Sequence, residues 1–175
     1  MFRSLAAVVL FVFSSTALGL AQDSGTYPNK TKTPGATFAV SKDDICVSGY
    51  SKKVRNVPVA IHNQAFQDYG ITPDGKKYEV DHLISLELGG SNAIENLWPE
   101  PYGITWGARV KDKLEDALHK RVCAGTMDLL DAQDAIKTDW VKAYHSVFGA
   151  NAGPVEAKDE NDWLCTTGEP DCVKR

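Results

Sequence analysis

The sequence lacks a C-x-x-C pair, an internal repeat and, after its first 21 residues, any apolar run long enough to span a bilayer. The missing cysteine pair argues against a zinc ribbon. Positive charge is also scarce, since 19 Lys and Arg against 23 Asp and Glu give a formal net charge of -4. An acidic chain argues against a dedicated nucleic-acid binder, because phosphate contacts normally supply most of the affinity. The acidic charge is still compatible with an enzyme that contacts only a few phosphates of its substrate and releases the product after each reaction.

The chain of 175 residues is long enough for one domain with a real core. Its start has the features of a secretory signal peptide over residues 1–21: one cation at Arg3, an apolar run, and the small-x-small site Gly19-Leu20-Ala21. Removing this segment would take the net charge from -4 to -5. We therefore expect a protein secreted to an extracellular or periplasmic space, with no membrane segment in the mature form.

Four cysteines form an even set, which in an oxidising compartment predicts two disulfides. Sequence alone leaves three connectivities open. We favour Cys46–Cys123, which flanks the predicted domain, together with Cys165–Cys172, which closes a small local loop.

The pattern along the chain predicts an α+β domain over residues 45–149. A flexible lead-in precedes it over 22–44, and an acidic segment with a cysteine pair follows over 150–175. Helices are expected at about 57–69, 107–123 and 127–148, the last two as an antiparallel hairpin with apolar inward faces. Short clusters of positive charge, including Arg109-Lys111-Lys113, are interpreted one by one as solvated faces.

Residues 78–99 carry the strongest local pattern, reading Y-E-V-D-H-L-I-S-L-E-L-G-G-S-N-A-I-E-N-L-W-P. Apolar residues alternate with polar ones from Val80 to Leu86, which is the period of a strand. Turn residues 89–92 then break the pattern, and Asn96-Leu97-Trp98 predicts a second short strand that Pro99 and Pro101 should stop. With the helix that follows, the segment predicts a strand, a glycine turn, a strand and a helix.

This segment resembles the HNH nucleases, whose core is a ββα-metal finger. The resemblance rests on Asp81-His82, Gly89-Gly90 and Asn96-Leu97, and it is specific over roughly residues 79–99. It implies an HNH-like finger packed with additional helices and braced by a disulfide. It further implies that His82 is a general base, that Asp81 is a ligand of a divalent metal ion, and that Asn96 positions the loop beside His82. The implied substrate is nucleic acid, DNA rather than RNA.

The chain departs from this family in the finger helix, which usually offers a His or Asn as a further metal ligand. Thr105 lies where that ligand often falls, and Ala108 cannot bind metal. Three later helix residues are the alternatives: Asp112, Glu115 and His119. We favour Asp112 because it comes earliest on the helix. Two carboxylates favour Mg²⁺ or Mn²⁺, whereas a histidine ligand would make Zn²⁺ the better choice.

Two functions are therefore carried forward. The first is a secreted, metal-dependent HNH-type endonuclease that hydrolyses phosphodiester bonds with His82 as general base. The alternative is a catalytically degenerate HNH-like fold that acts as an extracellular binding or interaction module. The acidic charge and the missing early helix ligand favour the alternative, and the intact Asp81-His82 pair with Asn96 favours the enzyme.

Overall fold

A computed structural model describes residues 25–155, 163–164 and 173–174. The predicted signal peptide and the predicted Cys165–Cys172 bond lie outside these residues. The chain is α+β, as expected, and its elements run in this order: α1 (Lys42–Ile45), α2 (Tyr50–Val54), α3 (Val59–Tyr69), β1 (Tyr78–His82), the 3₁₀ turns η1 (Leu86–Leu88) and η2 (Ile94–Asn96), β2 (Leu97–Pro101), α4 (Ala108–Cys123), α5 (Leu129–Phe148), β3 (Trp163–Leu164) and β4 (Val173–Lys174).

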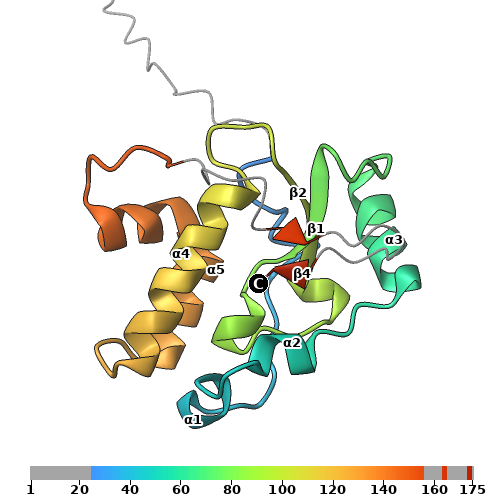
Figure 1. The fold of residues 1–175 in the computed structure, drawn as a ribbon. Coiled ribbons are helices and arrows are strands. Elements are labelled where there is room, and N and C mark those ends of the chain that lie inside the picture. The colour runs from blue at the N-terminus through green and yellow to red at the C-terminus, as the bar shows by residue number, and fades with distance from the viewer. Residues whose placement is uncertain (1–24, 156–162, 165–172, 175) are drawn as a thin grey trace, which may run out of the picture.

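Strands β1 and β2 form an antiparallel ribbon, with α3 on one side and the pair α4–α5 on the other (Figure 1). The register sets Asp81 opposite Trp98 and Glu79 opposite Glu100. Because directly opposed residues share a face and neighbours alternate, these four side chains lie on one face of the ribbon. The other face carries His82 and meets α3.

The three predicted long helices are present, within two residues of their expected ends. Helix α3 begins after Pro58 and ends at Gly70, whose φ of 66° is the left-handed conformation that glycine adopts readily. Helix α5 contains a kink that the sequence pattern did not predict, at Asp139 (φ -162°, ψ 89°). The Asp139 carboxylate accepts hydrogen bonds from the Tyr27 hydroxyl and from the backbone N–H of Lys142.

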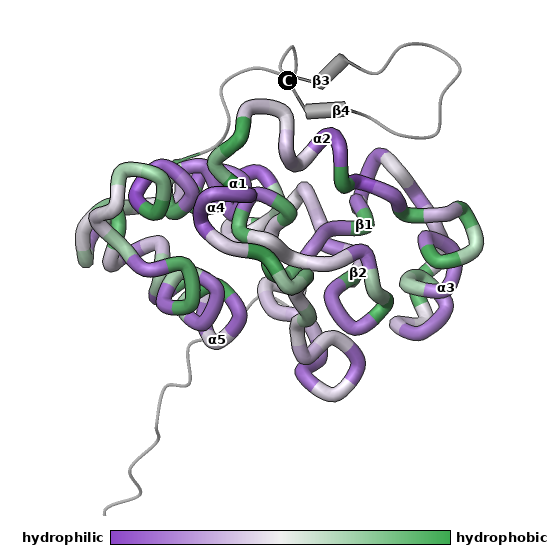
Figure 2. Tube along the Cα trace, turned by 90° about the horizontal axis from the view of Figure 1, so that it is seen from below, coloured by the Kyte–Doolittle hydropathy of each residue, from purple (hydrophilic) through white to green (hydrophobic). Residues whose placement is uncertain are grey.

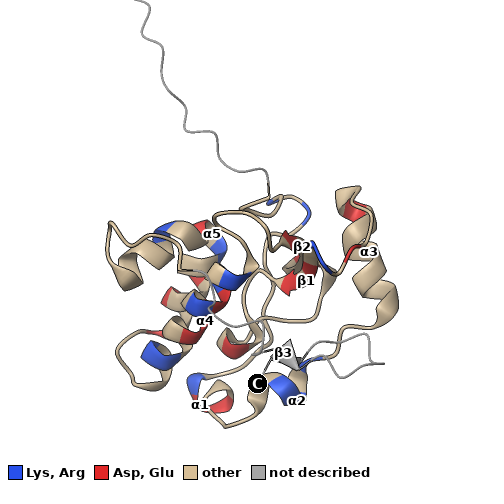
Figure 3. Cartoon of the chain, turned by 45° about the horizontal axis from the view of Figure 1, so that its top comes forward, with Lys and Arg blue, Asp and Glu red and all other residues tan. Residues whose placement is uncertain are grey.

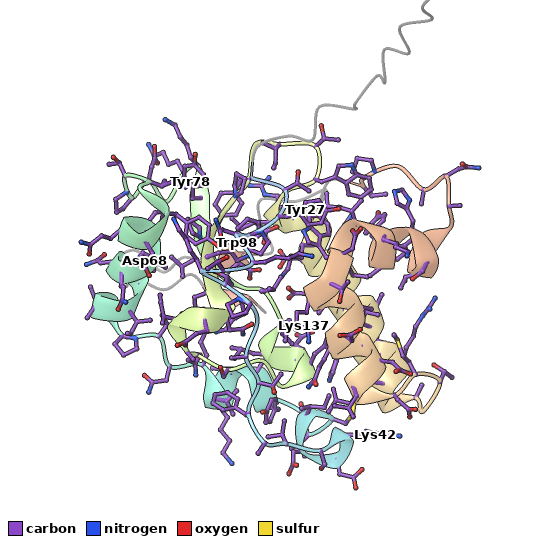
Figure 4. All side chains as sticks on the ribbon, turned by 180° about the vertical axis from the view of Figure 1, so that it is seen from behind. Tyr27, Lys42, Asp68, Tyr78, Trp98 and Lys137 are labelled. Carbon is purple, nitrogen blue, oxygen red and sulfur yellow. A yellow bond between two sulfur atoms is a disulfide. The ribbon has the colours of Figure 1, made fainter. Side chains whose placement is uncertain are left out.

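The main core lies between α4 and α5, where Leu114, Leu118, Ile136 and Trp140 are almost completely buried. Hydrophilic and hydrophobic residues alternate along both helices, as expected where one face of each is buried (Figure 2). In the view from behind, Tyr27 lies beside α5 and Trp98 lies in the interior (Figure 4). The predicted helical hairpin therefore supplies most of the main apolar core, to which Ile84 and Leu88 from the loop between the strands also belong.

The first strand is shorter than its alternating pattern predicted. It ends at His82, and residues 86–88 form a 3₁₀ turn. Leu83 N–H still donates to the carbonyl of Asn96, but the N–H and carbonyl of Ile84 both bond to the Asn96 side chain. The prediction of a strand to Leu86 was wrong because a buried amide, rather than a neighbouring strand, takes these backbone groups.

Pro99 does not stop the second strand, as the sequence had predicted, but lies inside it; the strand ends at Pro101. The Leu97 carbonyl points away from β1 and accepts a hydrogen bond from Thr33. Pro99 and Pro101 share this outward orientation, because successive residues alternate in the direction of their backbone groups. Their missing N–H groups therefore cost the ribbon no hydrogen bond.

The expectation of a flexible lead-in was wrong for the described residues 25–44. Three backbone hydrogen bonds tie this segment to the loop between the strands: Gly35 N–H to Glu95, Phe38 N–H to Gly89, and Ser91 N–H to Ala36, the last two forming an antiparallel bridge between Thr37 and Gly90. Its low hydrophobicity was misleading because its contacts are made by the backbone rather than by apolar side chains.

The predicted Cys46–Cys123 disulfide is confirmed, with the two Cα atoms 5.6 Å apart. It joins the end of α1 to the last residue of α4. Among the described residues, no helix combines the length and the apolar character needed to cross a membrane.

The disulfide joins cysteines 77 residues apart. We predict that the double variant Cys46→Ala/Cys123→Ala loses about 4 kcal/mol of unfolding free energy, because the unfolded chain regains the entropy of an open loop. Urea titration of the oxidised proteins measures the difference. A loss below about 1 kcal/mol would contradict the prediction.

Candidate functional site

The loop between the strands is held by the side-chain amide of Asn96, which is completely buried. Its Oδ1 accepts a hydrogen bond from Ile84 N–H (2.9 Å), and its Nδ2 donates to the carbonyls of Ile84 (3.0 Å) and Ser91 (2.9 Å). A single side chain thus satisfies three backbone groups of the loop. This is the geometry expected of a residue that positions the loop.

The turn itself requires its glycines. Gly89 has a φ of 77°, and a Cβ on Gly90 would collide with the carbonyl of Ile84 and crowd Nδ2 of Asn96. Only a residue without a side chain lets the backbone return this close to Ile84.

The side chain of His82 is 2% exposed and bonded through Nε2 to Oδ1 of Asn92 (3.1 Å). The orientation of the Asn92 amide is set in turn, because its Nδ2 donates to the carbonyl of Val54 at the end of α2 (2.8 Å). Nε2 must therefore carry the proton and donate it to Asn92. In a neutral imidazole this leaves the lone pair on Nδ1.

Burial is the main cause that lowers the pKa of His82 to about 4. The charge of Asp81 opposes this shift, while the charge of Arg55 adds to it. His82 is therefore neutral at pH 7 and has an unprotonated nitrogen, which is the state a general base needs.

On the opposite face of the ribbon, the ammonium of Lys111 lies among oxygen atoms. Its Nζ is 2.5 Å from Asp81 Oδ2, 2.5 Å from Glu115 Oε1 and 2.9 Å from the carbonyl oxygen of His82. The Lys111 side chain is 1% exposed. Figure 3 shows acidic residues on β1 and β2 and both signs of charge along α4. Sequence patterning had placed Lys111 on a solvated face, whereas it is the central cation of a buried cluster.

Opposing effects set the ionisation of Asp81 and Lys111. Burial alone would raise the pKa of Asp81, but the nearby Lys111 ammonium holds it below the ordinary value. Burial alone would lower the pKa of Lys111, and the charges of Asp81, Glu115 and Glu100 raise it well above its ordinary value instead. The two groups thus form a charged pair across the range of pH in which the protein would work.

Two further acids on this face have pKa values that burial raises well above the ordinary value. Glu100 is 0% exposed and accepts no hydrogen bond at either oxygen; burial raises the pKa of Glu100 well above its ordinary value. A protonated Glu100 can donate to the carboxylate of Asp81. Burial likewise raises the pKa of Glu79, whose Oε2 accepts a hydrogen bond from the Tyr102 hydroxyl (3.3 Å).

These residues do not fit the divalent ion that the family resemblance implies at Asp81. An ammonium already lies on Oδ2 of Asp81, where the ion would bind, and a second cation there would be repelled. Asp112 acts by its charge on Glu79 and Tyr102. The joint binding of one ion by Asp81 and Asp112 stays a prediction.

One group of side chains among the described residues could hold a metal ion: Cys46, His119 and Cys123, with ligand atoms within 4.8 Å of one another. Here the two sulfurs are joined to each other, and Nε2 of His119 lies 3.3 Å from Cys123 Sγ and 3.2 Å from the carbonyl oxygen of Ile45. The group could bind a metal only after the disulfide is reduced. His119 thus lies beside the disulfide, while Glu115 pairs with Lys111.

Sequence reasoning missed Lys111, Asn92 and Glu100 as members of this region. Two signals could have found Lys111 and Glu100. Glu79, Asp81 and Glu100 share a face once the strand register is known. On α4, Lys111 and Glu115 are four residues apart, which is the spacing of an ion pair. The role of Asn92 has no comparable signal, because it depends on how the loop meets α2.

Comparison of the chain with protein-family models, with curated proteins and with solved structures finds no match to any of them.

Replacing Asn96 by Ala should lower the free energy of unfolding by about 3 kcal/mol or more, because three buried backbone groups lose their partner. Chemical denaturation measures this change. The control is Asn63→Ala on the exposed surface of α3, which should be nearly neutral. Equal effects of the two substitutions would show that the amide of Asn96 does not hold the loop.

Replacing Glu100 by Gln should change how stability depends on pH. In the wild type the unfolded chain releases the Glu100 proton near its ordinary pKa and the folded chain keeps it. The stability that this group contributes is therefore fully present at low pH. It falls by about 1.4 kcal/mol per pH unit above that pKa, until the folded pKa is passed.

Glu100→Gln removes this loss, so the free energy of unfolding of the variant should rise relative to that of the wild type as pH increases from about 5 to 7. Thermal unfolding at several pH values measures the gain, with Glu95→Gln on the exposed surface as the control. Parallel pH profiles for the wild type and Glu100→Gln would mean that Glu100 is ionised in the fold.

Proposed function

We propose that this protein is a secreted phosphodiester hydrolase of the HNH type, with His82 as general base. Its proposed substrate is nucleic acid, with DNA in preference to RNA. The observation that carries the proposal is the chain of hydrogen bonds from Val54 through Asn92 to Nε2 of His82. It leaves a neutral imidazole with its lone pair on Nδ1, next to a loop that Asn96 holds in place.

The surroundings of His82 also suit a phosphodiester. Arg55 is exposed and close enough for its charge to influence the pKa of His82, and Lys52 and Lys53 precede it on α2. Such a group of cations can contact the backbone of a nucleic acid without reading its sequence. The anionic substrate would also raise the pKa of His82 as it approaches, which makes proton transfer to Nδ1 easier.

In the proposed reaction, Nδ1 of His82 removes a proton from water and the oxygen of that water attacks phosphorus. The new P–O bond forms as the bond to the leaving oxygen breaks, and the leaving oxygen takes a proton from solvent. The positive charge of Arg55 stabilises the negative charge on the phosphate oxygens. The resemblance and the two carboxylates led us to expect a divalent metal cofactor, Mg²⁺ or Mn²⁺ in preference to Zn²⁺. The proposed hydrolysis steps do not require a metal ion.

Secretion is part of the proposal. The Cys46–Cys123 disulfide supports it, because such bonds persist in oxidising compartments and are rare in the cytosol. The apolar start of the sequence suggests the same route.

The alternative function, an extracellular binding module on a degenerate HNH-like fold, is favoured by two specific observations. His82 is 2% exposed, so a substrate has little access to its ring in this conformation. Asp81 is neutralised by Lys111 rather than available to a metal ion. The two functions differ in whether the purified protein turns over a phosphodiester.

The test is digestion of plasmid DNA and of single-stranded RNA by the purified oxidised protein, with Mg²⁺, with Mn²⁺, with Zn²⁺ and with EDTA. We expect His82→Ala to reduce cleavage by about two orders of magnitude or more, because the general base is lost. The matched control is His62→Ala on α3, whose ring packs on Phe66, and it should retain activity.

Circular dichroism of both variants verifies that they are folded. Undiminished cleavage by His82→Ala would overturn the assignment of the base. A wild-type protein inactive on both substrates under all four conditions would favour the binding module.

A further inference from the structure

The position of Lys111 is unusual for a lysine, because the whole side chain is inside the protein. Three oxygens from two parts of the chain surround Nζ: one from the side chain of Asp81, one from the backbone of His82 and one from the side chain of Glu115. The first two come from β1 and the third from α4. An ammonium has three N–H donors, so this arrangement uses all of them.

The same oxygens are the kind that hard divalent ions prefer. Carboxylate and carbonyl oxygens bind Ca²⁺ and Mg²⁺ in proteins, and Glu100 adds a further buried carboxyl group beside Asp81. The cluster thus has the donors of a cation site. Its centre, however, is occupied by a positive charge that is covalently part of the chain.

This internal charge is required by the burial of its partners. Two largely buried carboxylates without a cation would be strongly unfavourable, because little of either group is exposed to water. A bound metal ion and a lysine ammonium are two ways to meet the same requirement. The chain meets it with Lys111, which also holds α4 against β1.

We propose that Lys111 is the resident cation of this site. Its ammonium occupies the place of a divalent ion between β1 and α4, so the native protein binds no divalent metal there. Loss of the ammonium opens a divalent-cation site at Asp81 and Glu115. This inference goes beyond the proposed function and does not depend on it, because it concerns cation binding and stability and needs no substrate.

The first test uses the wild-type protein with its disulfides oxidised, so that Cys46 and Cys123 cannot bind metal. Millimolar Mg²⁺, Ca²⁺ or Mn²⁺, and also EDTA, should leave its Tm unchanged. In NMR spectra, Mn²⁺ should not selectively broaden the amide signals of Asp81, His82 and Lys111. Selective broadening of these signals, abolished by Asp81→Asn, would overturn the proposal.

The second test compares two variants that lose the same charge. Lys111→Ala leaves a space beside Asp81 and Glu115, whereas Lys111→Met fills that space with an uncharged chain of similar length. Both should unfold at a Tm lower by about 10 °C or more, because two buried carboxylates lose their partner.

Only the Tm of Lys111→Ala should rise again when Mn²⁺ or Ca²⁺ is added, or when ethylammonium, a small molecule that supplies the missing ammonium group, is added. Equal recovery of both variants, or recovery of neither while both are folded, would contradict the proposal. If Lys111→Ala does not fold, the wild-type NMR experiment decides alone.

The outcomes separate this inference from the proposed function. Divalent binding at Asp81 in the wild type would overturn the role of Lys111 and leave His82 as a candidate base. Loss of the His82 assignment in the cleavage assay would leave the metal titrations, and the conclusion about Lys111, unaffected.

Discussion

The buried ammonium of Lys111 is the interaction on which the arrangement of ribbon and helix depends. It joins Asp81 and the backbone of β1 to Glu115 on the next turn of α4. Burying charges is costly unless each is paired and hydrogen-bonded, and here a single lysine pairs with two carboxylates. The position of α4 along the ribbon is thereby restricted, since a shift of one turn would separate Lys111 from Asp81 and from the carbonyl of His82.

This pairing divides the region around the Asp-His pair into two parts. Neighbouring residues on a strand point to opposite faces, so Asp81 lies in the acidic cluster under α4 while His82 lies on the side of α2 and α3. The two groups influence each other by charge but bond to different partners. The chemistry available at His82 therefore comes from Asn92, Arg55 and the loop, and the acidic cluster serves mainly to hold α4.

Some features could be predicted from the sequence, because they depend on residues close together in the chain. The limits of α3, for example, follow from Pro58 and Gly70. The pairing of Cys46 with Cys123, 77 residues apart, was instead favoured among three connectivities because the two cysteines flank one domain. Other predictions failed where long-range contacts overrode local pattern. The strand ended at His82 because Asn96 took the backbone groups of Ile84, and the polar lead-in is ordered because its backbone bonds to the loop.

The sequence by itself determined the α+β class, the three long helices and the glycine turn, since periodicity and turn residues are properties of neighbouring residues. Its resemblance to the HNH nucleases directed attention to His82, Asp81 and Asn96. Only the tertiary structure decided that Lys111 is buried on Asp81, that Asn92 selects the tautomer of His82, and that burial raises the pKa of Glu100. Each of these results depends on desolvation and on the direction of hydrogen bonds between distant segments. Neither exists until the chain has folded.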